Sequence, residues 1–352
     1  MKPLAKNLML IAAACIAAGI MLVVFAFAMC GFNVQALSTD LPYEEKSYTY
    51  DGTKVKSLNI KGLEYDVELI TSNDNQFKIT TFENEKEQYE IKLSPSGELS
   101  IRYETTKRWY DYIRLNIDLD DRAITVAVPE GYLGPMDLSS NAGDVRMSGL
   151  NLKDTLEAET ALGSIELNDL TSLKQMSFSS GSGTIQLKKV SAGGDIALET
   201  NLGDVKAESV QAAGKLSMKS GSGRIKLDES SVNNDLSINT NLGDVDIIAT
   251  QIAGNMTVTT GSGALHLTQT AAKGDVTLET SLGDIIFRQL SGNNLYITSS
   301  SGEVQGNILG KADDYTIDAR TSSGSLNVPH SANGPKLLQV STGLGDIDID
   351  FK

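Results

Sequence analysis

NLGDVKAESVQAAGKLSMKS at residues 201–220 is followed by GSGRIKLDESSVNNDLSINT at 221–240 and NLGDVDIIATQIAGNMTVTT at 241–260. The third position of each stretch is a glycine, and glycines keep this spacing of twenty residues at Gly143, Gly163, Gly183, Gly203, Gly223, Gly243, Gly263 and Gly283. The spacing then drifts slightly, to Gly302, Gly324 and Gly345. A fixed period of this length predicts a repeat protein in which every repeat is one structural unit.

Each repeat contains two pairs of apolar residues that alternate with polar ones. The first pair begins two residues after the marker glycine, as in Val205 and Ala207 or Ile225 and Leu227. The second pair follows later in the repeat, for example Leu216 and Met218. Alternation with a period of two predicts two short strands per repeat, each with one buried face.

A unit of two short strands cannot bury its apolar face alone, so successive units must stack with their strands in parallel. The sequence therefore predicts an all-β fold, a single-stranded β-solenoid (β-helix) with coils of about twenty residues. With a strand spacing of about 4.8 Å, the intervals from Gly143 to Gly345 predict a rod of roughly 50 Å. A β-sandwich also uses short strands, but nothing in a sandwich requires a fixed register over so many repeats.

The stretches between the two strands carry residues that tolerate the positive φ of tight corners. These residues are Gly194, Gly214, Asn234, Gly254, Gly274 and Asn294. The position before the marker glycine alternates between leucine (Leu162, Leu202, Leu242, Leu282) and serine (Ser182, Ser222, Ser262). We interpret these large and small corners as packing that interdigitates neighbouring coils.

A row of hydroxyl residues runs beside these corners, and we expect it to bond coil to coil. Its predicted members are Thr160, Ser180, Thr200, Ser220, Thr240, Thr260, Thr280 and Ser300.

The amino terminus carries the signal of a membrane anchor. No charged residue lies between Asn7 and Thr39, and the 22 residues from Leu8 to Met29 are almost all apolar. As a helix this run reaches about 33 Å, enough to cross a bilayer core of about 30 Å. Lys2 and Lys6 would hold the amino end in the cytoplasm by the positive-inside rule. The alternative is a cleaved signal peptide, whose apolar region is usually shorter.

The charge balance limits the classes of partner. The chain has 30 Lys and Arg against 45 Asp and Glu, a net charge of −15. After residue 39 there are 28 basic and 45 acidic residues, a net charge of −17. Such a surface repels nucleic acid and anionic lipid headgroups, so no nucleic-acid partner is expected. The two cysteines, Cys15 and Cys30, lie within or at the end of the apolar run, which leaves no disulfide for the exported part.

These signals predict a cytoplasmic amino terminus (1–7), a transmembrane anchor (8–30), a linker (31–48), a β-rich cap (49–135) and the repeat solenoid (136–352). The cap would cover the open strand edges of the first coil. At the other end, outward carboxylates of Asp346, Asp348 and Asp350 would discourage end-to-end stacking.

The segments "GLEYDVEL" (62–69), "SPSGELSI", "ITVAVPEGY", "GSGTIQL" and "LGDVDI" resemble a bacterial adhesin-like family that is also classed as a domain of unknown function. Members of that family are membrane-anchored and associated with envelope-stress regulators. The resemblance covers roughly residues 50–352 and implies the β-solenoid fold. It implies no catalytic residues.

Candidate chemistry is sparse along the repeats. The chain has only two histidines, His266 and His330, which restricts acid–base catalysis and metal binding near neutral pH, and both are predicted to lie on the surface. A carboxylate pair could serve a polysaccharide-acting β-helix enzyme, but the outward rows mix both charges. Recurring aspartates such as Asp204 and Asp244 lie two coils, about 10 Å, apart, too far to share one calcium ion. With Arg224 between them, charge alternation is the better explanation, and no cofactor or metal is expected.

One segment departs from this uniformity and is the candidate ligand contact: Lys107, Arg108, Trp109, Tyr110, Tyr112 and Arg114. It holds the only tryptophan and the densest cationic group of an acidic chain. One interpretation is structural, with the segment packed as a cap over the first coil. The other is functional, a glycan or peptide contact, for which Trp and Tyr supply rigid amphipathic surface.

The sequence as a whole favours a non-enzymatic, adhesin-like surface or scaffold module. We expect it to be held at the cell membrane by one helix, with its carboxyl-terminal part outside. The expected partners are the membrane itself and a cell-envelope glycan or regulatory protein.

Overall fold

The structure, a computed structural model, describes residues 3–29, 42–108 and 122–352. It confirms the predicted fold class: the chain forms a β-solenoid of about eleven coils. The coils belong to a compact unit that consists of residues 46–81, 89–103 and 123–352. A second unit contains residues 1–45, 82–88 and 104–122.

The amino-terminal residues form helix α1, which spans Pro3–Met29. Within the described part of the chain, no helix meets the combined requirements of length and apolarity for crossing a membrane.

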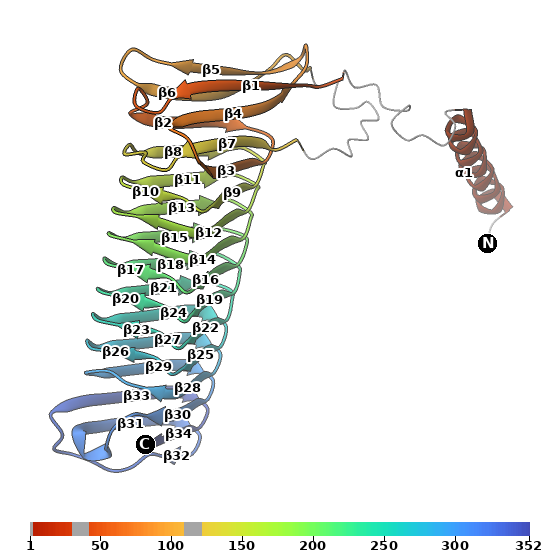
Figure 1. Cartoon of the computed structure of the whole chain (residues 1–352). Coiled ribbons are helices and arrows are strands. Elements are labelled where there is room, and N and C mark those ends of the chain that lie inside the picture. Colours follow the sequence, from red (N-terminus) through yellow and green to blue (C-terminus); the bar gives the residue numbers. More distant parts are fainter. Residues whose placement is uncertain (1–2, 30–41, 109–121) are drawn as a thin grey trace. The chain divides into compact units, whose positions relative to one another are not determined.

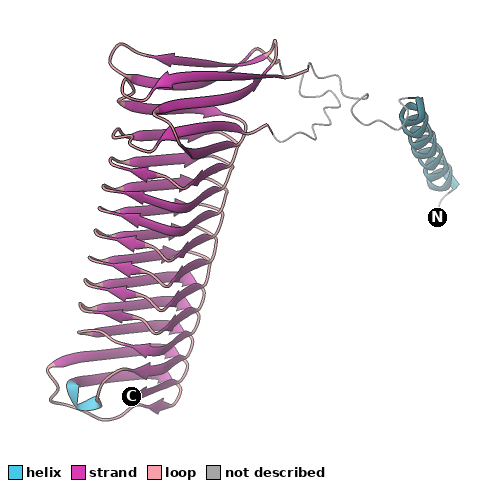
Figure 2. Cartoon of the chain, in the orientation of Figure 1, coloured by secondary structure: helices cyan, strands magenta, loops and turns pink. Residues whose placement is uncertain are grey.

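One face of the solenoid is a sheet of fourteen strands, three of which come from the amino-terminal region 49–135. Its central strands are β8 (Met136–Ser140), β11 (Leu156–Thr160), β13 (Met176–Ser180), β15 (Ile196–Thr200), β18 (Leu216–Ser220), β21 (Leu236–Thr240), β24 (Met256–Ser262), β27 (Val276–Leu282) and β29 (Leu295–Ser301). From β8 to β27 neighbouring coils pair in parallel with an offset of twenty residues, as in Leu156 with Met176 and Met176 with Ile196. Figure 2 shows the strands of successive coils stacked one on another.

The second sheet has twenty strands, and five of the central coils contribute two strands each to it. Its central strands are β9 (Val145–Ser148), β10 (Asn151–Leu152), β12 (Ile165–Ser172), β14 (Ile185–Ala192), β16 (Val205–Glu208), β17 (Gln211–Ala212), β19 (Ile225–Asp228), β20 (Ser231–Val232), β22 (Val245–Ile248), β23 (Gln251–Ile252), β25 (Leu265–Thr268), β26 (Ala271–Ala272), β28 (Ile285–Leu290) and β30 (Val304–Ile308). These five coils have three strand segments, one more than the sequence predicted.

The alternation of side chains along the two predicted strands is confirmed. Ile225 is fully buried, while Lys226 beside it is half exposed and forms an ion pair with Asp228. The buried residues of all coils form one continuous apolar core along the solenoid. Because the parallel strands are in register, each side chain lies on the equivalent side chain of the neighbouring coil. Every coil can therefore repeat the same pattern of buried and exposed residues.

At both ends of the solenoid the chain leaves the simple coil order. The amino-terminal strands are β1 (Glu44–Asp51), β2 (Ser57–Leu63), β3 (Val67–Ser72), β4 (Gln76–Glu83), β5 (Glu87–Leu93), β6 (Glu98–Thr105) and β7 (Ile124–Pro129). Strand β2 pairs with both β6 and β8, and β3 pairs with both β7 and β9. The coil β2–β3 comes first in the chain, but it therefore lies between the β6–β7 coil and the β8–β9 coil. The region predicted to be an unrepeated cap contributes coils of its own.

The carboxyl-terminal end repeats this arrangement with β31 (Tyr315–Ser323), β32 (Leu326–Asn327), β33 (Lys336–Leu344) and β34 (Ile347–Phe351), after a short 3₁₀ helix at Ala312–Asp314. Strand β33 lies between β29 and β31, as Figure 1 shows, and β34 lies between β30 and β32. The outermost coil is β31–β32. Strand β34 is not the outermost strand, because β32 pairs with Ile347 and Asp348 and Asn327 donates a hydrogen bond to Asp348. That the carboxylates of β34 discourage end-to-end stacking stays a prediction.

The tight corner with positive φ lies at a different place from the one predicted. The left-handed residues lie six positions after the marker glycine of each coil, beginning with Gly149 at φ 68°. In the next seven coils this position is not glycine, and φ ranges from 47° to 56°, at Asp169, Lys189, Ser209, Glu229, Ala249, Gln269 and Gln289. The predicted corner residue Gly214 has no left-handed φ; it is small because a Cβ there would collide with the Asp195 side chain.

The marker glycines are required by close approach between coils. A Cβ on Gly223 would collide with the carbonyl oxygen of Gly203, and the same contact recurs from coil to coil. The strict spacing of twenty residues is therefore a steric requirement of the stack.

Candidate functional surface

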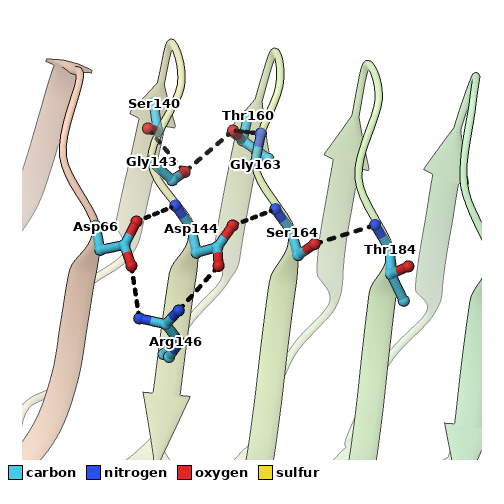
Figure 3. Close-up of polar contacts among 9 residues, drawn as sticks. All are labelled: Asp66, Ser140, Gly143, Asp144, Arg146, Thr160, Gly163, Ser164 and Thr184. Carbon is cyan, nitrogen blue, oxygen red and sulfur yellow. Dashed lines mark hydrogen bonds and ion pairs between the residues drawn. The ribbon is translucent and has the colours of Figure 1, made fainter. Parts of the chain in front are cut away.

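Figure 3 shows a row of polar side chains that ties the coils together just after the marker glycine. The Asp66 carboxylate accepts the backbone N–H of Asp144 at 2.8 Å, and Asp144 in turn accepts the N–H of Ser164 at 2.8 Å. The Ser164 hydroxyl accepts the N–H of Thr184 at 3.3 Å. Arg146 bridges the two carboxylates, 2.7 Å from Asp66 and 2.9 Å from Asp144. Each carboxylate thus satisfies a donor in the next coil.

The same bonds continue along the solenoid and explain why Gly-Asp recurs in the sequence. Asp204 accepts the N–H of Arg224 at 3.0 Å, and the Arg224 guanidinium lies 2.9 Å from Asp244. The backbone N–H of Ala264, followed by the Arg224 guanidinium, lowers the pKa of Asp244 below its ordinary value. This confirms the predicted charge alternation: the carboxylates serve the backbone and the neighbouring cation.

The opposite corner carries a second row of the same kind. Asp195 accepts the N–H of Lys215 at 2.8 Å, and Asp235 accepts the N–H of Asn255 at 2.9 Å. Among the described residues, no three His, Cys, Asp or Glu side chains are grouped closely enough to hold a metal ion.

The hydroxyl row is structural, as predicted, and its geometry is now clear. The Thr200 hydroxyl donates to the carbonyl oxygen of Gly183 in the preceding coil at 2.9 Å. Its final predicted member is wrong: Ser299, which is buried and bonded to Gly283, takes the place assigned to Ser300. The register moves by one residue because the interval between Gly283 and Gly302 is one residue short.

The leucine corners contradict the sequence interpretation, because they do not pack between coils. Leu162 is 65% exposed and Leu202, Leu242 and Leu282 are each 60% exposed. Leu344 of the last complete coil is 59% exposed. An exposed leucine at every second coil makes a periodic apolar row, which we call the leucine row.

A cavity of about 500 Å³ lies beside the first coils. Its wall includes Gly131, Tyr132, Gly134 and Pro135, and Leu133 at its rim is 71% exposed. The Tyr132 hydroxyl donates to the carbonyl oxygen of Pro135 at 3.0 Å, and burial raises the pKa of Tyr132. The sequence did not predict this cavity, because its wall brings together residues from separate segments of the chain, including 52–56 and 129–135.

The predicted ligand segment is only partly described. Trp109, Tyr110, Tyr112 and Arg114 lie outside the described residues. Lys107 is mostly buried and lies 2.6 Å from Glu87, whose side chain is 2% exposed, while Arg108 is exposed. Lys107 thus contributes to a buried ion pair within its own unit. The histidines lie where predicted: His266 is half exposed, 3.3 Å from Asp246, and His330 is exposed.

This combination of parallel coils, polar inter-coil rows and a repetitive outer surface defines a β-solenoid repeat protein. More particularly, the chain belongs to the Toastrack DUF4097 family, whose model matches residues 55–253 and 216–352. The match confirms the resemblance found in the sequence.

Two solved structures illustrate the likeness. A cell adhesion protein candidate from Clostridium sporogenes has 13% identity and a TM-score of 0.31, and the match covers 88% of this chain and all of that one. An adhesin candidate from Bacteroides fragilis has 13% identity and a TM-score of 0.39, with 87% and 97% covered. No curated protein matches the chain.

Proposed function

We propose that the protein is a non-enzymatic, adhesin-like surface module that a single amino-terminal helix holds at the cell membrane, with the solenoid outside. The observation that carries this proposal is how the polar groups are used. The carboxylates and hydroxyls at the corners are occupied in joining coils, as with Asp204 to Arg224 and Thr200 to Gly183. What remains is a long, regular outer surface, which suits contact with another large surface better than turnover of a small substrate.

The anchor is supported by the sequence. The run from Leu8 to Met29 lacks charged residues, and Lys2 and Lys6 precede it. The net charge of −17 after residue 39 keeps the exported part soluble and away from anionic headgroups. Partners in the cell envelope follow as a class, either glycan or protein.

The topology is tested in intact cells that express the full chain with an epitope tag after Lys352. We expect the tag to be digested by external protease and the protein to stay in the membrane after alkaline extraction. The variant with Ile16→Lys and Val23→Lys should lose membrane retention, because each charge at the centre of a spanning helix costs about 3 kcal/mol. Release of the wild-type chain into the medium, or a protected tag, would contradict the proposal.

The partner is sought by capture with the full chain, with Trp109→Ala and Tyr110→Ala as the matched variant. Loss of about tenfold or more in affinity, with unchanged thermal melting, would assign the contact to this segment. Unchanged binding would move the contact elsewhere on the solenoid, and lost binding with a lowered melting temperature would give the segment a structural role.

A further inference from the structure

From coil to coil in the structure, the leucines of the leucine row alternate with small residues without exception, whereas along the sequence this alternation is interrupted. Along the chain the residues before the last glycines are Leu282, Ser301, Ser323 and Leu344, so the alternation breaks. In the structure it does not, because Leu344 pairs with Ser301 on one side and with Ser323 on the other. The swapped strand order at the carboxyl end restores large-small alternation over all the coils. The spatial order is Ala142, Leu162, Ser182, Leu202, Ser222, Leu242, Ser262, Leu282, Ser301, Leu344, Ser323.

Folding does not explain this alternation. The leucines stay about 60% exposed, as with Leu202 and Leu242, so they add little to the core. Because coils are about 4.8 Å apart, the leucines form knobs about 9.6 Å apart, and the small corners between them are holes. A surface that fits this row must have the same period and be offset by one coil. A second copy of this row has that period.

Charge follows the same alternation. Two positions flank each corner, the residue three before it and the residue two after it. At the four leucine corners from Leu162 to Leu282, six of these eight flanking residues are acidic: Glu159, Glu199, Asp204, Asp244, Glu279 and Asp284. Beside the three serine corners from Ser182 to Ser262 none is acidic, and two residues, Lys219 and Arg224, are cationic. Opposing leucine corners to serine corners therefore places carboxylates against neutral or positive groups.

We propose that the leucine row is the contact surface between two copies of this chain, paired antiparallel about a two-fold axis between the coils of Ser222 and Leu242. A parallel two-fold pair would put each leucine against the same leucine. The antiparallel pair with this axis puts Leu242 against Ser222, and it likewise matches every other leucine of the row with a small corner. The matched pairs are Leu202 with Ser262, Leu162 with Ser301, Leu282 with Ser182, and Leu344 with Ala142.

The charges agree with this register. Asp244 of one copy faces Arg224 of the other, and from Leu162 to Ser301 no two acidic flanking residues face each other. Two carboxylates meet only at the outermost matched coils, Asp346 against Asp144, and Asp144 is paired with Arg146. The strip from Leu162 to Leu344 is about 40 Å long. It buries on the order of 1,000 Å² over both copies, the lower end for specific pairs, so we expect a weak, reversible dimer.

The pairing itself is independent of the membrane anchor, but its consequence rests on the proposed surface function and deepens it. Antiparallel solenoids place their amino-terminal coils at opposite ends of the pair. Chains anchored in two facing membranes could then hold each other, so the adhesive partner would be a second copy of this protein.

Crosslinking of the full chain tests the register, with Cys15→Ser and Cys30→Ser as background and a thiol crosslinker that spans about 10 Å. We expect Leu162→Cys chains mixed with Ser301→Cys chains to crosslink, and Leu162→Cys chains alone not to, since those two positions are about 34 Å apart in the pair. Crosslinking of Leu162→Cys alone, without the mixed product, would overturn the antiparallel register. No crosslink in either sample would overturn the pairing, whatever the topology assay gives.

Mass measurement by light scattering on the solubilised full chain separates shape-specific pairing from general stickiness. Leu202→Gln with Leu242→Gln should weaken the dimer about tenfold or more. Leu173→Gln removes a leucine that is 63% exposed but outside the row, and should leave the dimer unchanged. Ser222→Leu fills a hole and should also weaken the dimer. Stronger association of Ser222→Leu would overturn the proposal, because it would mean that exposed apolar area alone drives the contact.

Discussion

The central coils and the two ends of the solenoid solve the same packing problem in different ways. In the centre each coil lies on the one before it in the chain, so strand partners are always twenty residues apart, as Ile225 and Val245 are. At the ends the chain leaves this order. At the carboxyl end it skips one layer and then fills it, so that Tyr315 pairs with Lys336 and β33 separates β31 from β29. The centre gains burial from identical neighbours, whereas the outermost strand β31 stays mostly half exposed.

The largest expected effect sharpens this difference in burial. Ile225→Asp places a carboxylate without a partner in the core and should lower the free energy of unfolding by more than about 4 kcal/mol. Ile317→Asp on the outermost strand should cost less, about 1 to 2 kcal/mol, because Ile317 is only partly buried. Lys226→Asp is the surface control, at about 1 kcal/mol or less. Equal losses in denaturant unfolding would mean that the centre and the end are packed alike.

A smaller effect is expected from the contacts between coils. Gly223→Ala forces a Cβ against the carbonyl oxygen of Gly203 and should cost about 3 kcal/mol. Gly131→Ala, near the amino-terminal end, meets no heavy atom within 4 Å and should stay within about 0.5 kcal/mol. Thermal melting of the two variants measures the difference. A tolerated alanine at position 223 would show that the spacing of the coils can expand.

The smallest effect concerns the left-handed corner, which is glycine only in its first coil, at Gly149. Ala249→Gly relieves a φ of 47° and should stabilise by about 0.5 to 1 kcal/mol. Ala253→Gly, whose φ is not positive, should destabilise by a similar amount because glycine gains freedom in the unfolded chain. The two changes are matched in chemistry and opposite in expected sign. A loss of stability in both variants would show that the left-handed corner is not strained.

The sequence predicted the features that repeat and missed those that depend on the order of layers. The glycine spacing and the alternation around Ile225 identify the solenoid because each coil obeys the same steric rule. The third strand was not predicted because it is only two residues long, as in Gln211–Ala212, and its buried position changes from Leu152 to Ser172 and Ala212, so it has no constant apolar signature.

The changed order of coils at the two ends was not predicted, because a repeated residue such as Leu344 identifies its position within a coil but not which coil lies next to it. The exposure of the leucine row was misread for a related reason, since a regular apolar residue is usually part of a core. Of the candidate site, the partner and the role of the aromatic segment stay predictions, because Trp109 and its neighbours lie outside the described residues.

The swapped carboxyl terminus also sets the order in which the protein can be completed. A simple solenoid can finish each coil as its residues emerge, but here the layer between β29 and β31 is made of the last strands, β33 and β34. Until residues 336–352 arrive, β31 and β32 have no coil to lie on. Residues 336–352 therefore complete the stack, because without them the layer on which β31 and β32 lie is missing.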